Sequence, residues 1–261
     1  MKIATCQYKL SEHTWPAYIK KIESMMVSAK QQNVDLILLP EYAGIEIGDP
    51  TVYADKELFA SLQSSLDKYI LFFQKMAKQY QLYILAGTTI VSANQEKYLN
   101  RAYFFEPSGK YHHQDKLQLT QYEKNSGLIL QGEKQQVFDT KWGKIGIAIC
   151  YDSEFPEIVR NLVKAGAWLI LVPSYTISLA GYYRVCLSAR ARAIENQCFV
   201  AAVNRVGEDG NGLKYSGDSL LIDALGNESP LSEGKEEVKI VTLKMDELNS
   251  TREMLPFLKD R

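Results

Sequence analysis

The sequence is poor in histidine and has no closely paired cysteines. It contains only three histidines, two of them the adjacent His112 and His113, and four cysteines with no CxxC spacing. Adjacent side chains on a strand face opposite sides, so these two histidines do not suggest a metal cluster. The cysteine spacing is not that of a zinc site or a dithiol redox motif. We therefore expect no metal site.

Long apolar runs and an excess of one charge are also missing. No stretch approaches the ~18 apolar residues of a membrane span. The 30 basic and 31 acidic residues give a net charge of −1, which does not favour nucleic acid or an anionic membrane as a partner. The first residues are typical of a strand and not of a signal peptide. With no export signal, we expect reduced thiols and a cytoplasmic location.

One stretch that is present stands out, the apolar, β-branched run at residues 145–149 that leads into Cys150. Such a run is typical of a buried strand. Proline is tolerated in a first helical turn, so Pro156 predicts a helix that runs to about Ala165. Cys150 is thus expected near a helix N-terminus, where its thiol pKa would be lowered. The alternative is a core cysteine without a chemical role.

A nucleophilic Cys150 would need a base, and the few histidines favour a carboxylate in that role. Glu41 directly follows a short apolar strand expected at residues 36–39 and ended by Pro40. Lys116 lies just beyond a hairpin expected at residues 101–113. Either residue alone could be an ordinary surface side chain, so the case depends on finding them together.

The rest of the chain alternates strands with amphipathic helices. Helices are expected at residues 16–30, 56–80 and 182–196, and strands at 3–7, 83–86, 168–172, 199–203, 219–223 and 238–243. This alternation implies an α/β layered fold. Loops are expected at residues 49–50 and 209–212, and no low-complexity linker interrupts the chain. We therefore expect a single domain over residues 1–261.

Residues 35–41 and 168–174 are similar to each other, since each follows a helix and ends in proline and a polar residue. This internal similarity suggests two related α-β halves. In α/β sheets, sites gather at the carboxyl ends of strands. Glu41, Cys150 and Ser174 are all expected at such ends.

Five motifs together resemble the nitrilase superfamily of carbon–nitrogen hydrolases. They are, in chain order, LLPE at residues 38–41, DKLQL at 115–119, GIAICYDSEFPE at 146–157, RARAIENQ at 190–197 and NRVG at 204–207. The similarity extends from Lys2 to Arg261. It implies an α/β fold of the α-β-β-α sandwich type, usually paired as a homodimer, with no metal or organic cofactor.

The resemblance also assigns roles to individual residues. Cys150 takes the position of the nucleophile, Glu41 of the general base, Lys116 of the cationic stabiliser and Glu123 of a second glutamate beside the site. The implied reaction is hydrolysis of a small amide through a cysteine thioester. Glu41 would move the proton, while Lys116 and the Tyr151 N–H would hold the oxyanion. The residues expected to contact the substrate are Tyr42, Tyr151, Glu154, Ser174 and Tyr175.

Two observations point to different substrates. ω-Amidase-like members often carry an arginine at the place of Glu154, where it is thought to hold a substrate carboxylate. The reversed charge would favour a neutral or cationic amide, unless an arginine such as Arg184 or Arg205 neutralises Glu154. Residues 204–218, in contrast, resemble those of bacterial ω-amidase-like members.

Other functions are less consistent with the sequence. Nitrile or N-carbamoyl hydrolysis would use the same site, but Tyr151 and Asp152 after the nucleophile favour amides. A catalytically silent binding module is disfavoured because the three matched catalytic residues are intact. The GDSL sequence at residues 217–220 would indicate a serine esterase, yet no histidine follows it. The apolar residues at 254–258 are expected to be docked, as in a dimer.

Overall fold

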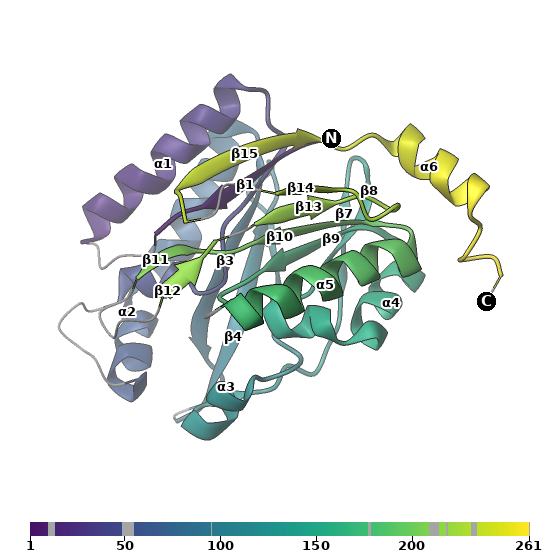
Figure 1. Cartoon of the computed structure of the whole chain (residues 1–261). Helices are drawn as coiled ribbons and strands as arrows, with labels where there is room; N and C mark the ends of the chain where they lie inside the picture. Colours follow the sequence, from purple (N-terminus) through teal and green to yellow (C-terminus); the bar gives the residue numbers. More distant parts are fainter. Residues whose placement is uncertain are drawn as a thin grey trace.

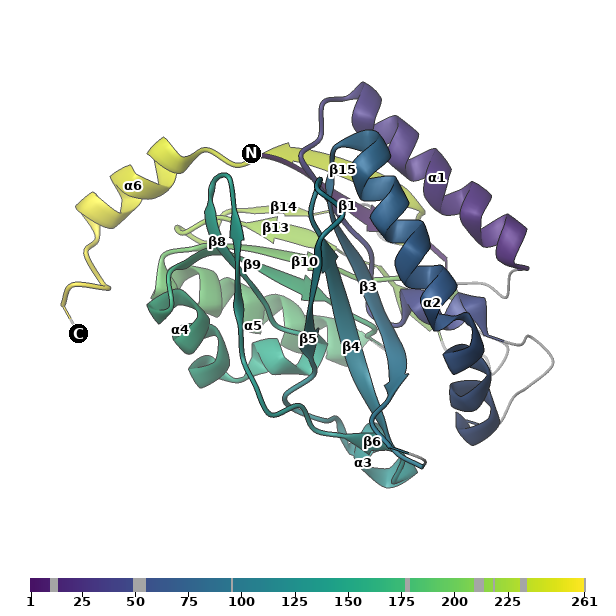
Figure 2. The same cartoon turned by 180° about the vertical axis from the view of Figure 1, so that it is seen from behind.

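The structure is a computed structural model, which describes residues 1–9, 14–48, 55–94, 96–176, 179–208, 214–217, 219–230 and 234–260. The loops expected at residues 49–50 and 209–212 lie outside these ranges, as does Asp218 of the GDSL sequence. Within the described ranges, two large sheets lie face to face, with helices on the outer face of each (Figures 1 and 2).

The first sheet has the strand order β15-β1-β2-β3-β4-β5, with β6 paired to β4. Its strands are β1 (Lys2–Gln7), β2 (Leu36–Leu38), β3 (Tyr83–Ser92), β4 (Tyr98–Phe105), β5 (Tyr111–Asp115), β6 (Ile129–Leu130) and β15 (Glu237–Thr242). The strands β1, β2 and β3 run parallel, and β15 closes the sheet antiparallel to β1.

The second sheet has the order β14-β13-β10-β9-β8-β7. Its strands are β7 (Val137–Thr140), β8 (Gly143–Ile147), β9 (Ala167–Pro173), β10 (Phe199–Val203), β13 (Leu220–Ile222) and β14 (Glu228–Pro230). The strands β8, β9 and β10 run parallel. A separate ribbon pairs β11 (Val206–Glu208) with β12 (Lys214–Ser216).

Three apolar layers hold the molecule together. The helices α1 (Trp15–Gln31) and α2 (Asp55–Tyr80) pack on the first sheet, while α4 (Pro156–Lys164) and α5 (Leu179–Asn196) pack on the second. Between the sheets, Leu85 and Phe104 of the first share a buried cluster with Ile147 and Leu171 of the second. Burying each such side chain contributes about 1.5–3 kcal/mol. The expected α-β-β-α sandwich is confirmed.

One strand is longer than the sequence predicts. The strand expected to end before Gly87 continues as β3 to Ser92, because the pairing with β4 shifts register between Leu85 and Thr88. Gly87 lies at this irregularity with φ of 68°, and a Cβ there would sit 2.0 Å from the carbonyl oxygen of Pro40. Glycine therefore marks a bulge here and lets the backbone approach the turn that follows β2.

The end of the chain also differs from the prediction. No helix was predicted after the strand at residues 238–243, but α6 (Met245–Met254) forms and the chain then extends away from the sandwich (Figures 1 and 2). Leu248 packs into the core between the sheets. Met254 is 71% exposed, and the apolar residues after it are partly exposed in the single chain.

Candidate active site

The side chains of Glu41, Lys116 and Cys150 meet next to the core that the two sheets share. Lys116 Nζ donates to Glu41 Oε1 over 2.9 Å. Glu41 also shares a side-chain hydrogen bond with Cys150. Glu41 is 1% exposed and Lys116 is 2% exposed, so this ion pair is removed from solvent. Three residues from distant parts of the sequence thus form one buried cluster.

The turn after β2 fixes the position of Glu41. The next residue, Tyr42, has left-handed backbone with φ of 60°, and its N–H donates to Thr88 Oγ1 over 2.8 Å. Non-glycine residues rarely adopt this conformation, which costs of order 1 kcal/mol or more. The backbone of Gly87 also packs closely against the carbonyl oxygen of Pro40 in the same turn. The bulge in β3 therefore supports the backbone that carries the glutamate.

The buried carboxylate of Asp152 ties the strand end near Lys116 to the turn that carries Cys150. Asp152 Oδ1 accepts from the N–H of Leu117 over 3.0 Å and of Gln118 over 2.6 Å. Its Oδ2 accepts from the N–H of Ile149 over 3.0 Å. These bonds connect a segment after the first sheet with a segment after the second. Asp152 thereby fixes the separation between the lysine and the cysteine.

Cys150 begins the short 3₁₀ helix η2 (Cys150–Glu154) and has φ of 46°. This strained left-handed conformation resembles the sharp strand-to-helix turn that presents nucleophiles in other hydrolases. The N–H of Tyr175 donates a hydrogen bond to the Cys150 sulfur. Cys150 thus has a base on one side and a backbone donor available to a developing thiolate.

Glu123 is the most extensively bonded residue of the site. Both of its carboxylate oxygens accept from Lys116 Nζ, over 2.9 and 2.8 Å. Tyr42 OH donates to Oε1 over 2.7 Å. Glu123 also forms a capping box with Thr120 at the start of α3 (Gln121–Ser126). Its position next to Lys116, expected only from a resemblance, is present in the structure.

The two glutamates have pKa values shifted in opposite directions. Burial, with the negative charge of Glu123, raises the pKa of Glu41 in spite of the opposing effect of Lys116. Burial would also raise the pKa of Glu123, but Lys116, Tyr42 and Thr120 lower it to below its usual value. Environments that separate two such pKa values indicate different roles. Glu41 is suited to exchange a proton, and Glu123 to remain ionised.

The sequence predicted a lowered pKa for the Cys150 thiol, and this prediction is wrong. Burial and the negative charge of Glu41 raise the pKa of Cys150, and the opposing effects of Lys116 and the Tyr175 N–H are smaller. The α-helix expected nearby begins only at Pro156, after the turn of η2. The raised pKa favours the protonated thiol, so Cys150 could act as a nucleophile only if a base removed its proton.

The tyrosines expected to contact the substrate surround this cluster. Tyr42 and Tyr175 meet edge to face with ring centroids 5.3 Å apart. The ring of Tyr151 packs against Phe155 at 5.0 Å. All three tyrosines are half-buried, so their rings are in part accessible. Their contacts with a substrate stay a prediction.

The other two residues expected at the substrate have different surroundings. Ser174 is fully buried, and its hydroxyl donates to the carbonyl of Val172 over 3.4 Å. Glu154 forms an ion pair with Arg184, with 3.1 Å between Oε2 and Nε. The negative charge that was expected to repel substrate carboxylates is therefore partnered by an arginine, as the sequence had left open.

Sequence reasoning missed Asn100 as a member of the site. Asn100 Nδ2 donates to Glu41 Oε1 over 2.9 Å and to Glu123 Oε1 over 3.2 Å. The carbonyl of Asn100 accepts from the N–H of Lys116 over 2.9 Å. The only available signal was a polar side chain within the apolar strand β4, which by itself does not indicate a role.

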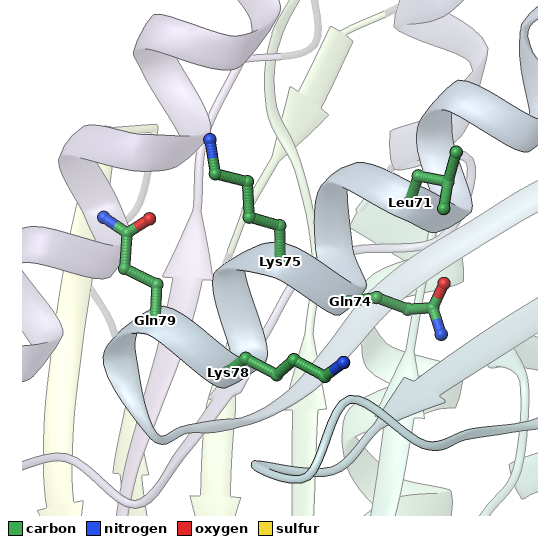
Figure 3. Close-up of a pocket in the computed structure, with 5 residues that line it drawn as sticks. All are labelled: Leu71, Gln74, Lys75, Lys78 and Gln79. Atoms are coloured by element: carbon green, nitrogen blue, oxygen red, sulfur yellow. The ribbon is translucent and has the colours of Figure 1, made fainter.

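Other features of the described residues do not suggest a second catalytic centre. A surface hollow of about 460 Å³ is lined by α2 side chains, Leu71, Gln74, Lys75, Lys78 and Gln79 (Figure 3). None of these residues belongs to the cluster above.

No group of three or more His, Cys, Asp or Glu side chains able to hold a metal occurs in the described ranges. In the same ranges, no helix is long and apolar enough to cross a membrane.

Comparisons with known proteins identify the family and the fold. A family model described as carbon-nitrogen hydrolase matches residues 2–253. The 2-oxoglutaramate amidase of Bacillus subtilis is 30% identical over 99% of this chain and 96% of its own length. A probable hydrolase of the same species is 30% identical over 79% of this chain. The matched part is only 40% of that protein's length. A crystal structure of a carbon-nitrogen hydrolase from Helicobacter pylori has a TM-score of 0.87 at 21% identity, covering 100% of this chain and 94% of that one.

Proposed function

This chain belongs to the carbon–nitrogen hydrolase family, and we propose that its hydrolysis of an amide C–N bond is carried out by Cys150, Glu41, Lys116 and Glu123. The observation that carries this proposal is the buried Lys116 held between two carboxylates, one of which also bonds the Cys150 thiol. The opposite pKa shifts of Glu41 and Glu123 support distinct roles for them.

In the first half of the reaction, the Cys150 sulfur attacks the amide carbon while its proton passes to Glu41. A base with a raised pKa holds this proton well and can return it. The carbonyl oxygen becomes an oxyanion, which Lys116 and the Tyr151 N–H stabilise. Glu41 then gives the proton to the nitrogen, the C–N bond breaks, and ammonia or an amine leaves. A thioester on Cys150 remains.

In the second half, a water molecule attacks the thioester carbon. Glu41 takes a proton from this water and returns it to the sulfur as the C–S bond breaks. The products are a carboxylic acid and the free thiol, so the enzyme returns to its starting state. Throughout, Glu123 stays ionised and orients Lys116, because its donors lower its pKa. Loss of one oxyanion donor typically costs about 10²–10³ in rate.

Three further properties belong to the proposal. The substrate is a small amide, as the name of the 2-oxoglutaramate amidase relative favours. The partner is a second copy of the chain, since α6 and the following residues leave apolar side chains such as Met254 exposed. The location is the cytoplasm, which agrees with the four free cysteines. Residues 1–261 would form one catalytic domain.

The test is ammonia release from a panel of amides, N-carbamoyl compounds and nitriles, combined with intact mass spectrometry of the quenched enzyme. We expect turnover of amides and a mass increase at Cys150 equal to the acyl group. Cys150→Ala should lose both signals while keeping its fold by circular dichroism. Cys186→Ala, which changes a cysteine on α5 outside the cluster, is the matched control. Wild-type turnover by Cys150→Ala would rule out the proposal.

A further inference from the structure

Arg205 is a buried cation that forms no ion pair with a carboxylate in the described part of the chain. It is 4% exposed. Its guanidinium carbon lies 3.9 Å from the ring centroid of Tyr215 and 4.8 Å from that of Tyr175. Its Nε has no hydrogen-bond acceptor among the described residues. A guanidinium presents five N–H donors, so this side chain has donor capacity that the two rings do not use.

The energetics favour an additional partner. A buried charge is costly unless it is paired and hydrogen-bonded. Contact with tyrosine rings contributes about 0.5–2 kcal/mol, but it supplies no acceptor for the Nε–H, which has none among the described residues. The ligand that best matches a planar fork of N–H donors is a carboxylate, which can accept two parallel hydrogen bonds.

The backbone at Arg205 is held rigidly. Asn204 Oδ1 accepts from the N–H of Arg205 and from the N–H of Thr176, each over 3.0 Å. The Asn204 N–H donates to Ser219 Oγ over 2.8 Å, and that hydroxyl donates to Gln7 Oε1 over 2.8 Å. Ser219 of the GDSL sequence is thus part of a buried scaffold and not a nucleophile. A site built on such a scaffold is preorganised for its ligand.

A row of aromatic rings connects Arg205 to the catalytic cluster. Tyr215 OH donates to Tyr175 OH over 2.6 Å, so the two rings that stack on the guanidinium are fixed to each other. Tyr175 reaches Cys150 through its N–H and meets Tyr42 ring to ring. Arg205 is therefore in direct contact with the ring of Tyr175, whose N–H bonds the Cys150 sulfur.

We propose that Arg205 binds a carboxylate at the far end of the amide substrate, so that the enzyme prefers mono-amides of dicarboxylic acids over neutral amides. This inference rests on the proposed amidase function and names its substrate class. The ion pair between Glu154 and Arg184 is consistent with it, because the acidic charge near the nucleophile is already partnered. Specificity then comes from a buried cation instead of from Glu154.

The experiment compares glutaramate with glutaramide, which differ only by a carboxylate in place of a second amide. The readout is the ratio of their kcat/KM values. For the wild type we expect a preference for glutaramate of about tenfold or more, the effect of a hydrogen-bonded charged group. Arg205→Gln should bring the ratio close to one, mainly through a higher KM for glutaramate. Arg205→Lys, which keeps the charge without the planar fork, should give an intermediate ratio.

Arg252→Gln is the matched control, since it removes an arginine of α6 that donates to the carbonyl of Gln197, outside the aromatic row. It should leave the preference for glutaramate in place. Equal wild-type efficiency on both amides would overturn the carboxylate site while leaving the amidase function intact. An unchanged ratio in both Arg205 variants would also overturn it.

A binding measurement separates this inference from the proposed function. If the wild type releases ammonia from neither amide, titration calorimetry of Cys150→Ala with glutarate decides the question. Glutarate binding that is lost in the Cys150→Ala, Arg205→Gln double variant supports the carboxylate site even if the chemistry is different. Absence of glutarate binding to Cys150→Ala overturns it.

Discussion

Asn100 and Glu41 are joined by a 2.9 Å hydrogen bond, in which the amide nitrogen donates to the same Oε1 that accepts from Lys116. The amide also donates to Oε1 of Glu123 over 3.2 Å. One neutral donor and one cation therefore hold two buried carboxylates close together. The two donors oppose the effects of burial and of Glu123, and so favour the ionised form of Glu41, which could accept a proton from Cys150.

We predict that Asn100→Ala shifts the pH dependence of catalysis. A donor to a carboxylate favours its charged form, so removing it raises the pKa of Glu41 further. The acidic limb of the kcat/KM profile should move to higher pH by about one unit. The loss of one hydrogen bond to the carboxylate is of the order of 1.4 kcal/mol, which corresponds to one pKa unit. A pH–rate profile of the amidase reaction measures this limb. Asn161→Ala, on an exposed position of α4, is the control and should not shift it. An unmoved limb in Asn100→Ala would contradict the role of Asn100.

We predict that Glu41→Gln and Lys116→Ala are strongly non-additive. Each single change should lower kcat by about 10³-fold or more, because the residues act with Cys150 as one unit. The kcat of the double variant should then be only slightly lower than that of the less active single variant. Single-turnover kinetics on one amide measure all three. If the two losses multiply in the double variant, the residues do not share a site.

Glu123 should make stability depend on pH. Its pKa is lowered in the folded state, so its stabilising contribution is present above its unfolded pKa of about 4.3 and is lost as the pH falls below that value. Glu123→Gln should therefore unfold more easily than the wild type at pH 7, by about 1–3 kcal/mol. Urea denaturation at pH 7 and at about pH 4 should show this difference shrinking in acid. A constant difference would mean that Glu123 is not a depressed carboxylate.

We predict a homodimer that involves the apolar residues after α6. Light scattering at micromolar concentration should give about twice the 29.6 kDa mass of one chain. Phe257→Glu should lower the measured mass, because a charge in an apolar interface is unfavourable. Leu71→Glu, at an exposed apolar position on α2, is the control and should keep the wild-type mass. A 29.6 kDa particle for the wild type would contradict the predicted homodimer.

Two members of the proposed catalytic cluster were predictable because they follow the carboxyl ends of buried strands. Glu41 and Cys150 each follow a buried apolar run that the sequence pattern identifies, and sites in α/β folds gather at such strand ends. The two runs are β2 of the first sheet and β8 of the second, so it is the facing of the two sheets that brings the residues together. Lys116 required the resemblance, since nothing local distinguishes it from a surface lysine. The alternation of strands and helices predicted an α/β layered fold, and the two-sheet sandwich was predicted from the resemblance.

The parts that sequence reasoning missed depend on contacts between distant residues. Asn100 reaches Glu41 across 59 positions of the chain, and Asp152 reaches Leu117 across 35. The thiol pKa was predicted in the wrong direction, because the depth of burial and the charge of Glu41 are properties of the assembled fold. Gly87 was interpreted as a strand end, since a glycine alone does not distinguish a bulge from a stop.

The pairing of β1 with β15 has a consequence for synthesis. The first sheet is closed by Glu237–Thr242 against Lys2–Gln7, and the amino group of Met1 donates to the carbonyl of Leu243, 242 positions away. At about 5–20 residues per second, the ribosome needs on the order of tens of seconds to deliver that last strand. During this interval one edge of the nascent sheet has no partner strand. The uncovered edge of β1 is therefore a place where the nascent chain could pair with other chains until β15 is made.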